Sequence, residues 1–186
     1  MRVLNVGGGT GREIPRHYKG WEQHVLDIDP NVGAEIVCDA KEMRTLKAAQ
    51  YDAIFCSHNL EHFYRHEVPT VLAGFRHVLK ADGFAQIAVP DLMALVRDMT
   101  DPDAVWYRTG AGVPITFHDV LYGWDAVMSK GNLFYAHKCG FSRESLTRVL
   151  RKAGFAKVLT AVDGYNVHAF AFQQKPTKAR LELLGL

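Results

Sequence analysis

The chain has 186 residues, and its 22 Lys and Arg against 20 Asp and Glu give a formal net charge of +2. With 48% apolar and 23% charged residues, the composition is that of a globular protein and excludes a wholly disordered chain. The small charge gives no indication of a nucleic-acid-binding face, and no apolar run approaches the ~18 residues of a membrane span. The N-terminus lacks the pattern of a secretion signal, so we expect a soluble, cytoplasmic protein.

Apolar runs in the first half of the chain predict four short strands, over residues 2–6, 24–27, 35–38 and 51–56. The first strand runs into a glycine-rich segment, Gly7 to Gly11. Residues 12–18 suit a helix that Pro15 limits to its first turns, and residues 39–49 suit a short helix. The turn residues 29–33 are too few for a normal crossover helix.

Apolar residues three and four apart predict a helix over residues 65–80, ended by the segment from Ala81 to Gly83. A strand over residues 84–89 follows. Asp91 is then expected to cap a helix over residues 92–99. Residues 100–140 are rich in Gly, Pro, Trp and Tyr without clear periodicity. We expect them to form an irregular cover over the sheet, too small to build a core of its own.

The last third of the chain has clear boundary signals. Ser142 is expected to cap a helix that runs to Lys152, with Glu144 close to a capping box. Two strands, over residues 156–162 and 165–173, form a hairpin around the Asp163-Gly164 turn. The sequence therefore predicts an α/β, Rossmann-like, doubly wound fold, mostly parallel, with one antiparallel strand from the C-terminal hairpin. We expect a single domain over residues 1–174 and a frayed or peripheral tail over residues 175–186.

Three cysteines, Cys38, Cys56 and Cys139, are too few and too widely spaced for a disulfide framework or a Cys-based zinc site. No two of them form a CxxC pair. We expect free thiols, with Cys38 and Cys56 lying in apolar, strand-like runs.

The chemistry is expected at the carboxyl ends of the first three strands. Glycines at Gly7, Gly9 and Gly11 allow a sharp turn and a close approach of a ligand to the backbone. Asp27 ends the second strand, where an acidic side chain can accept both hydroxyls of a ribose. Asp39 ends the third and can meet the exocyclic amine of an adenine. A tight turn and ordinary helix caps are the alternatives, and they explain one strand end better than all three.

Seven segments together, in this order, resemble the class I S-adenosylmethionine-dependent methyltransferases, in particular their type-11-like branch. The resemblance covers about residues 1–99 and 137–173. The segments that match the family's motifs are Val3–Gly11, Asp27–Pro30, Cys38–Ala40, Tyr51–His62, Val78–Gly83, Ala88–Leu92 and Phe141–Phe155.

This resemblance implies a seven-stranded sheet and S-adenosylmethionine as the cofactor. Its methionine end would lie on the three glycines and its ribose on Asp27. The remaining expected cofactor residues are Ile28, Asp39 and Ala40 near the adenine, and Ser57 at the end of the fourth strand. Family members usually have a helix before the first strand and a longer crossover after the second. A cover for the cofactor must therefore come from residues 100–140 or from another subunit, and a homo-oligomer remains open.

The acceptor of the methyl group is expected to be a small molecule. The fourth strand ends in Ser57-His58-Asn59-Leu60, which differs from the Asn/Asp-Pro-Pro-aromatic motif of enzymes that methylate planar amino groups. Oxygen or carbon is therefore favoured, and nitrogen on a small molecule stays open. Several aromatic residues form either an acceptor pocket or the core of the cover: Trp106, Tyr107, Phe117, Tyr122, Trp124, Phe134 and Tyr135.

Two histidines are candidates for a catalytic base. His58 directly follows the fourth strand, and His137 lies where residues 100–140 return to the sheet, so we favour His137 as the proton acceptor. His62 is expected to pack on a helix. We expect no metal site, because the histidines are scattered along the sequence without fixed ligand spacing. The alternatives are a non-catalytic cofactor-binding protein and a nicotinamide reductase, which the glycine spacing opposes.

Overall fold

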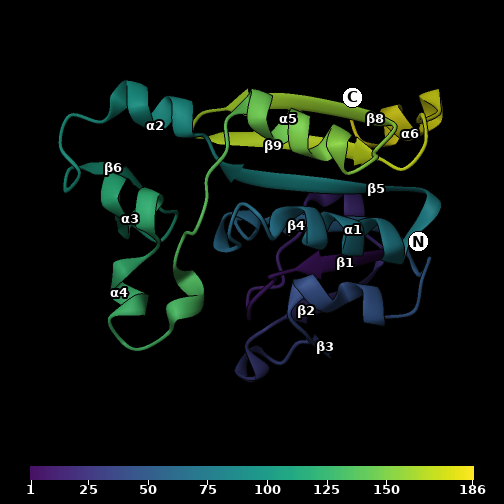
Figure 1. The fold of residues 1–186 in the computed structure, drawn as a ribbon, viewed down its shortest axis with the longest axis horizontal. Coiled ribbons are helices and arrows are strands. Elements are labelled where there is room, and N and C mark those ends of the chain that lie inside the picture. The colour runs from purple at the N-terminus through teal and green to yellow at the C-terminus, as the bar shows by residue number, and fades with distance from the viewer.

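The centre of the computed structural model, which describes residues 1–186, is a seven-stranded sheet in the order β3-β2-β1-β4-β5-β9-β8 (Figure 1). Neighbouring strands from β3 to β5 pair in parallel, and β9 is antiparallel to both β5 and β8. This confirms the predicted fold. The strands are β1 (Arg2–Val6), β2 (Glu22–Asp27), β3 (Ile36–Val37), β4 (Tyr51–Ser57), β5 (Leu79–Pro90), β8 (Lys157–Asp163) and β9 (Asn166–Phe172).

Alternating side chains of the central strands enter two separate cores, as the two-residue period of a strand requires. From β1, Leu4 packs in a cluster of 26 buried residues, while Val3 packs in a cluster of six on the opposite face. Ile54 and Ala53 of β4 divide in the same way. Both faces of these strands are therefore buried, which explains their nearly continuous apolar sequence.

The two faces have coverings of different size. The large core lies under α1 (Val68–Val78), α5 (Arg143–Lys152) and the 3₁₀ helix η3 (Ala40–Thr45). The small core lies under the 3₁₀ helix η1 (Arg16–Tyr18) and the C-terminal segment with α6 (Lys178–Leu183). Leu184, next to α6, is buried against the sheet, so of the two alternatives for the tail, frayed or peripheral, the tail is not frayed at this point.

Local signals misplaced three other boundaries. Residues 12–15 are not helical, and only η1 forms after Pro15. The helix α1 ends at Val78, and β5 begins at once at Leu79, so the segment from Ala81 to Gly83 lies in that strand. The hairpin turn is Gly164-Tyr165, because Asp163 already pairs with Asn166.

Two helix caps compare well with the sequence signals. Asp91 accepts from the Met93 backbone and caps α2 (Leu92–Asp98), as predicted. Ser142 caps α5, but the reciprocal partner in its capping box is Ser145 and not Glu144. The three cysteines are free thiols, as expected.

Residues 100–140, which we call the cover, are more ordered than their sequence predicted. They contain a two-stranded sheet and two short helices, and Leu95, Ile115, Phe117 and Val120 form a small buried cluster between the cover and α2. A stacked pair, Trp106 and Phe117, adds to this cluster. The expectation of an irregular segment was therefore wrong, and the core of the segment is shared with α2. The elements of the cover are β6 (Val105–Arg108), β7 (Pro114–Thr116), α3 (Phe117–Tyr122), α4 (Asp125–Met128) and η5 (Leu133–Tyr135).

The cover lies beside the carboxyl end of the parallel strands, at the left of Figure 1, and returns to the sheet at residues 136–139. The backbone N–H groups of Lys138 and Cys139 both donate to the carbonyl oxygen of Glu61, at 2.8 and 3.2 Å. The N–H of His137 donates to Tyr122, at 2.9 Å. The first two bonds fix the end of the cover to the segment after β4, and the third holds this end to α3.

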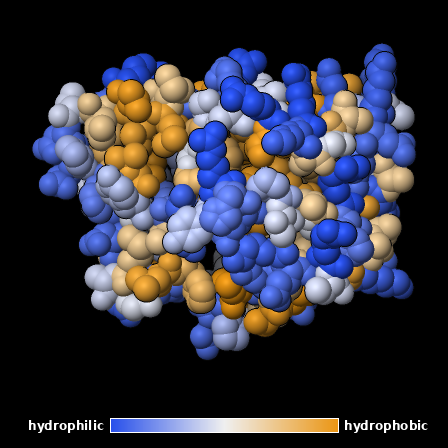
Figure 2. All heavy atoms as spheres, in the orientation of Figure 1, coloured by the Kyte–Doolittle hydropathy of each residue, from blue (hydrophilic) through white to orange (hydrophobic).

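The surface shows one apolar area over α2, at the upper left of Figure 2, where Met93 and Val96 are exposed. Nothing in the structure covers these two side chains. No helix of the chain has the length and apolar character needed to cross a membrane.

Asp119 is expected to hold the middle of the cover together. Its carboxylate accepts from the N–H and hydroxyl of Thr116, at 2.9 and 2.8 Å, and from the N–H of Asp125, at 3.1 Å. Asp119→Ala removes these bonds and should destabilise residues 114–125 by about 1–2 kcal/mol. Faster amide hydrogen exchange there, with unchanged exchange in β4 and β5, would be the result. Asp125→Ala, at an exposed position, is the matched control and should change little.

The same carboxylate gives the cover a pH dependence. Burial acts to raise the pKa of Asp119, but the bonds from Thr116 and Asp125 lower it below the ordinary aspartate value. A lowered pKa means that the stabilisation is complete above the ordinary value and is lost as the pH falls through the lowered one. Exchange in residues 114–125 should therefore accelerate on acidification in the wild type, and much less so in Asp119→Ala.

Candidate active site

The glycine segment makes a sharp turn at the carboxyl end of β1. Gly7 and Gly9 have φ angles of 71° and 55°, which side-chain-bearing residues rarely adopt. A side chain at Gly7 would collide with Asn59, whereas the space beside Gly9 is open. The turn therefore packs against the end of β4 on one side and leaves the backbone of Gly9 accessible on the other.

Asp27, at the end of β2, braces this turn. Its carboxylate accepts from the N–H of Gly9 and from the N–H of Asp29, both at 3.0 Å. A carboxylate has about four acceptor sites, so about two remain for a ligand. A second brace is Glu35, which accepts from Val25 and from Arg12, and these bonds lower its pKa to about 2.

A cleft of about 230 Å³, which we call the glycine-loop cleft, lies along the ends of β1, β2 and β3. Two residues that the sequence suggested do not line it: Gly11, which is exposed, and Ser57, at the end of β4. Six suggested residues do line it: Gly7, Gly9, Asp27, Ile28, Asp39 and Ala40. The fold thus brings most of the expected cofactor residues to one surface.

Sequence reasoning missed several residues of this cleft. Asn59 lines it from the end of β4, and its buried Oδ1 has no hydrogen-bond partner. Tyr135 and Lys138 reach it from the cover. Lys41 lies beside it, 3.4 Å from Asp39 and 2.8 Å from Glu67. Asn59 directly follows His58 in a matching motif and was therefore recognisable, but the cover residues had no sequence signal.

A larger cavity of about 700 Å³, which we call the cover cavity, lies between the cover and the ends of β5, β8 and β9. Aromatic side chains form much of its wall. Tyr165 lies 4.3 Å from Trp106 and is stacked at 5.6 Å on Tyr107, measured between ring centroids. Trp124 and Tyr135 also line it. The aromatic residues therefore serve both as cavity wall and, through Trp106 and Phe117, as the core of the cover.

Three residues, His58, His62 and Tyr135, line both the glycine-loop cleft and the cover cavity. The two spaces are therefore neighbours with a common wall. His58 reaches this wall through a left-handed backbone conformation, with φ of 50°, and its N–H donates to Ala88 at 2.9 Å. His137 lines the cover cavity from the returning end of the cover.

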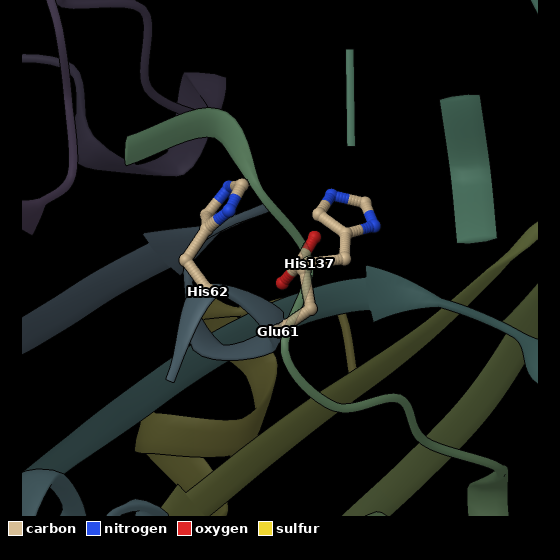
Figure 3. Close-up of side chains that lie close together, drawn as sticks. All are labelled: Glu61, His62 and His137. Carbon is tan, nitrogen blue, oxygen red and sulfur yellow. The ribbon is translucent and has the colours of Figure 1, made fainter. Parts of the chain in front are cut away.

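At the common wall, Glu61, His62 and His137 lie together, although the two histidines are far apart in the sequence. Their ligand-type atoms are all within 4.8 Å of one another, and the Glu61 carboxylate points into the space between the two rings (Figure 3). Glu61 is 1% exposed, and neither of its carboxylate oxygens has a hydrogen-bond partner. The basic nitrogen nearest to this carboxylate is Nδ1 of His58, which lies 3.5 Å from Oε1 of Glu61.

The surroundings of this group shift the pKa values of Glu61 and His137. Burial acts to raise the pKa of Glu61, and the imidazoles of His58, His62 and His137 lower it, with a net downward shift. Burial lowers the pKa of His137 below its ordinary value, and Glu61 offsets only part of this. His137 is therefore mainly uncharged at neutral pH.

The sequence agrees with a known family over most of its length. The family model described as "Methyltransferase domain" matches residues 1–160. No curated protein matches the chain significantly.

Solved structures agree in fold. An S-adenosylmethionine-dependent methyltransferase from Archaeoglobus fulgidus has a TM-score of 0.59 and 16% identity, over 92% of this chain and 85% of that one. A 1,6-didemethyltoxoflavin-N1-methyltransferase from Burkholderia thailandensis, with its substrate and S-adenosylhomocysteine bound, has a TM-score of 0.55 and 19% identity, over 94% of this chain and 71% of that one. The family match identifies the chain as a member of the methyltransferase-domain family, and its fold is that of the class I S-adenosylmethionine-dependent methyltransferases.

Proposed function

We propose that this protein transfers a methyl group from S-adenosylmethionine, bound in the glycine-loop cleft, to oxygen or carbon of a small molecule in the cover cavity. The main support is the common wall of the two spaces, formed by His58, His62 and Tyr135. Direct transfer requires the donor and acceptor to meet with their reacting atoms in line and in contact. Two adjoining spaces of these sizes supply such a meeting point.

The residues of the glycine-loop cleft suit this cofactor chemically. Asp27 has acceptor sites left for the hydroxyls of a ribose, and Asp39 lies where an adenine amine needs an acceptor. The buried Oδ1 of Asn59 lacks a donor, which the amino group of the methionine part supplies. The open side of Gly9 admits a ligand close to the backbone.

When bound, S-adenosylmethionine supplies a methyl carbon on a positively charged sulfur, and the acceptor atom bonds to this carbon while the carbon–sulfur bond breaks and leaves its electron pair on sulfur. The protein has to position the acceptor, exclude water and receive the acceptor's proton where there is one. His137, uncharged and facing the cover cavity, is our preferred proton acceptor. His58, on the common wall, is the second candidate.

The cover cavity favours a flat or aromatic acceptor. Its wall contains the Trp106, Tyr107 and Tyr165 group, and flat rings pack well against such side chains. The Burkholderia thailandensis relative binds 1,6-didemethyltoxoflavin, so the fold accommodates a small molecule beside the cofactor product. Oxygen or carbon remains our preferred atom, since the segment from Ser57 to Leu60 lacks the motif for planar amino groups.

The competing proposal is a non-catalytic protein that binds S-adenosylmethionine with the same fold, because fold alone does not give activity. The two differ in whether the cover cavity receives an acceptor. Purified protein should be incubated with methyl-labelled S-adenosylmethionine and a panel of small phenols, catechols, hydroxy acids and aromatic amines. Label on a panel member supports the enzyme, whereas S-adenosylhomocysteine binding without any transfer favours the alternative.

A blocked cover cavity sharpens this test. His168 lines the cavity from β9, and its side chain makes no hydrogen bond within the protein. His168→Trp therefore fills space in the cavity without removing a bond. We expect lost transfer with unchanged S-adenosylhomocysteine affinity. His66→Trp, at an exposed position outside both cavities, is the matched control and should keep both.

Asp27→Ala should weaken cofactor binding while the fold stays intact. A hydrogen bond to a charged group contributes roughly 1.5–3 kcal/mol, so losing the ribose contacts should reduce affinity by about one to three factors of ten. Calorimetry with S-adenosylhomocysteine measures this, and Asp103→Ala on the exposed cover is the control. Wild-type affinity in Asp27→Ala would contradict our placement of the ribose.

His137→Ala should lower turnover by ~10²–10⁴ at saturating cofactor, as expected for loss of a general base, with unchanged S-adenosylhomocysteine affinity. His58→Ala should have the smaller effect on turnover. Single-turnover rates with the acceptor from the labelling screen provide the comparison. A near-wild-type rate, or an equal loss of cofactor affinity, would leave His137 as a residue that only stabilises the cover.

A further inference from the structure

Glu61, His62 and His137 are arranged like the ligands of a metal ion. Each side chain offers a ligand atom, and these atoms lie within 4.8 Å of one another (Figure 3). Glu61 and His62 are neighbours on η4 (Leu60–His62), and His137 comes from the end of the cover. The bonds from Lys138 and Cys139 to the Glu61 carbonyl oxygen hold the two segments together. The group is therefore positioned by backbone contacts and not by a chance meeting of side chains.

The carboxylate of Glu61 lacks the partner that its burial demands. It is 1% exposed, and neither oxygen accepts a hydrogen bond. Buried charges in proteins are normally paired or coordinate a metal ion. The nearest basic nitrogen is Nδ1 of His58, which lies 3.5 Å from Oε1 of Glu61. Its side chain is 46% exposed. A cation between Glu61 and the two rings would compensate this charge.

Both imidazoles have the orientation that metal-binding histidines require. Nδ1 of His62 lies 3.1 Å from the carbonyl oxygen of Ala136, and Nδ1 of His137 lies 2.8 Å from that of Val120. A carbonyl oxygen only accepts, so each Nδ1 holds the proton and donates it. Each Nε2 then keeps a free lone pair. Histidine ligands of metals typically donate their second nitrogen in this way, which fixes the ring and its tautomer.

The donor set selects the kind of cation. One carboxylate oxygen with two imidazole nitrogens suits first-row transition metals and zinc, whereas Mg²⁺ and Ca²⁺ prefer oxygen ligands alone. Ligands at about 2.0–2.2 Å from one ion lie about 3.0–3.5 Å apart. Small side-chain rotations therefore close the present separations. Three protein ligands leave coordination positions open, and His62 and His137 both line the cover cavity.

We propose that Glu61, His62 and His137 bind one divalent transition-metal or zinc ion at the common wall of the two cavities. This site goes beyond the proposed function, and only its chemical role rests on that function. A cation there supplies Lewis acidity, which lowers the pKa of a hydroxyl group that reaches an open position. The preferred acceptor is then a small molecule with an ionisable hydroxyl. In this arrangement His137 is a metal ligand and no longer the proton acceptor, so the hydroxyl proton passes to the exposed His58, the second candidate base of the proposed function.

Metal binding can be tested without cofactor or acceptor. Tag-free protein is stripped with a chelator and titrated with Co²⁺, by calorimetry and by visible absorption. We expect one equivalent to bind and to produce ligand-field bands of nitrogen and oxygen coordination, whereas Mg²⁺ should not compete. Glu61→Gln, which keeps the shape but removes the charge, should weaken Co²⁺ binding by at least ~100-fold, beyond the ~10–100-fold of an outer partner.

His137→Gln is the second ligand variant, and it covers the case in which Glu61→Gln fails to fold. His66→Ala, an exposed histidine outside the group, is the control and should bind Co²⁺ as the wild type does. Unfolding temperature and S-adenosylhomocysteine affinity report whether each variant is folded. No stoichiometric Co²⁺ binding, or equal binding by the wild type and a folded ligand variant, would overturn the proposal.

The same measurements separate this proposal from the proposed function. Co²⁺ binding that depends on Glu61 and His137 supports the metal site even where no acceptor is methylated. Methyl transfer at the full rate by chelator-treated protein that binds no Co²⁺ would overturn the metal site and leave the methyltransferase proposal intact. Transfer that is lost on chelation and restored by Co²⁺ in the wild type would support the Lewis-acid role.

Discussion

The two hydrogen bonds from Lys138 and Cys139 to the carbonyl oxygen of Glu61 determine how the functional surfaces meet. They join the end of the cover to the segment after β4, two regions that are distant in sequence. His137 thereby lies beside His62, with their ring centroids 4.9 Å apart. Because β4 ends at the same edge as the glycine turn, the cover closes one cavity and contributes to the other. A single backbone acceptor thus links the sheet, the cover and both cavities.

The sequence predicted the sheet well because the apolar pattern of each strand reflects which of its faces are buried. Runs such as Tyr51–Ser57 are apolar nearly throughout, since both faces of the strand are covered, and the hairpin signal near Asp163 requires only neighbouring residues. Predictions failed where the outcome depends on distant contacts. The tail mixes charged residues with leucines, and Leu184 is buried because the sheet offers it a free face. The cover has weak periodicity because its elements are short and its core includes Leu95 of α2.

The residues of the candidate site also divide into those that the sequence could place and those that it could not. Asp27 and Asp39 were predictable because the carboxyl ends of parallel strands meet at one edge, whatever the rest of the chain does. Gly11 follows the same glycine pattern but is exposed and does not line the cleft. The group of Glu61, His62 and His137 was not predictable, because His137 joins it only through the path of the cover. Spacing rules for ligands recognise residues on one helix or loop and miss a group that tertiary contacts assemble.

The shared wall also provides a route by which binding in one cavity would affect binding in the other. Four cover residues line the glycine-loop cleft: Asn132, Phe134, Tyr135 and Lys138. A ligand in that cleft would therefore contact the cover directly. If it orders the cover, it also orders the wall of the cover cavity. By linkage, an acceptor that orders the cover must strengthen cofactor binding by the same factor.

This coupling matters more here than in a fold with a longer crossover after β2, because only the short η2 (Pro30–Val32) stands between β2 and β3. The exposed side chain of Ile28 and the half-buried Val32 close one side of the cleft, so the cover has to close the other. In the proposed function, the segment that would recognise the acceptor would thus also shield the cofactor from water. A methyl group on a sulfonium is best protected when its intended acceptor is already bound, and this arrangement ties those two conditions together.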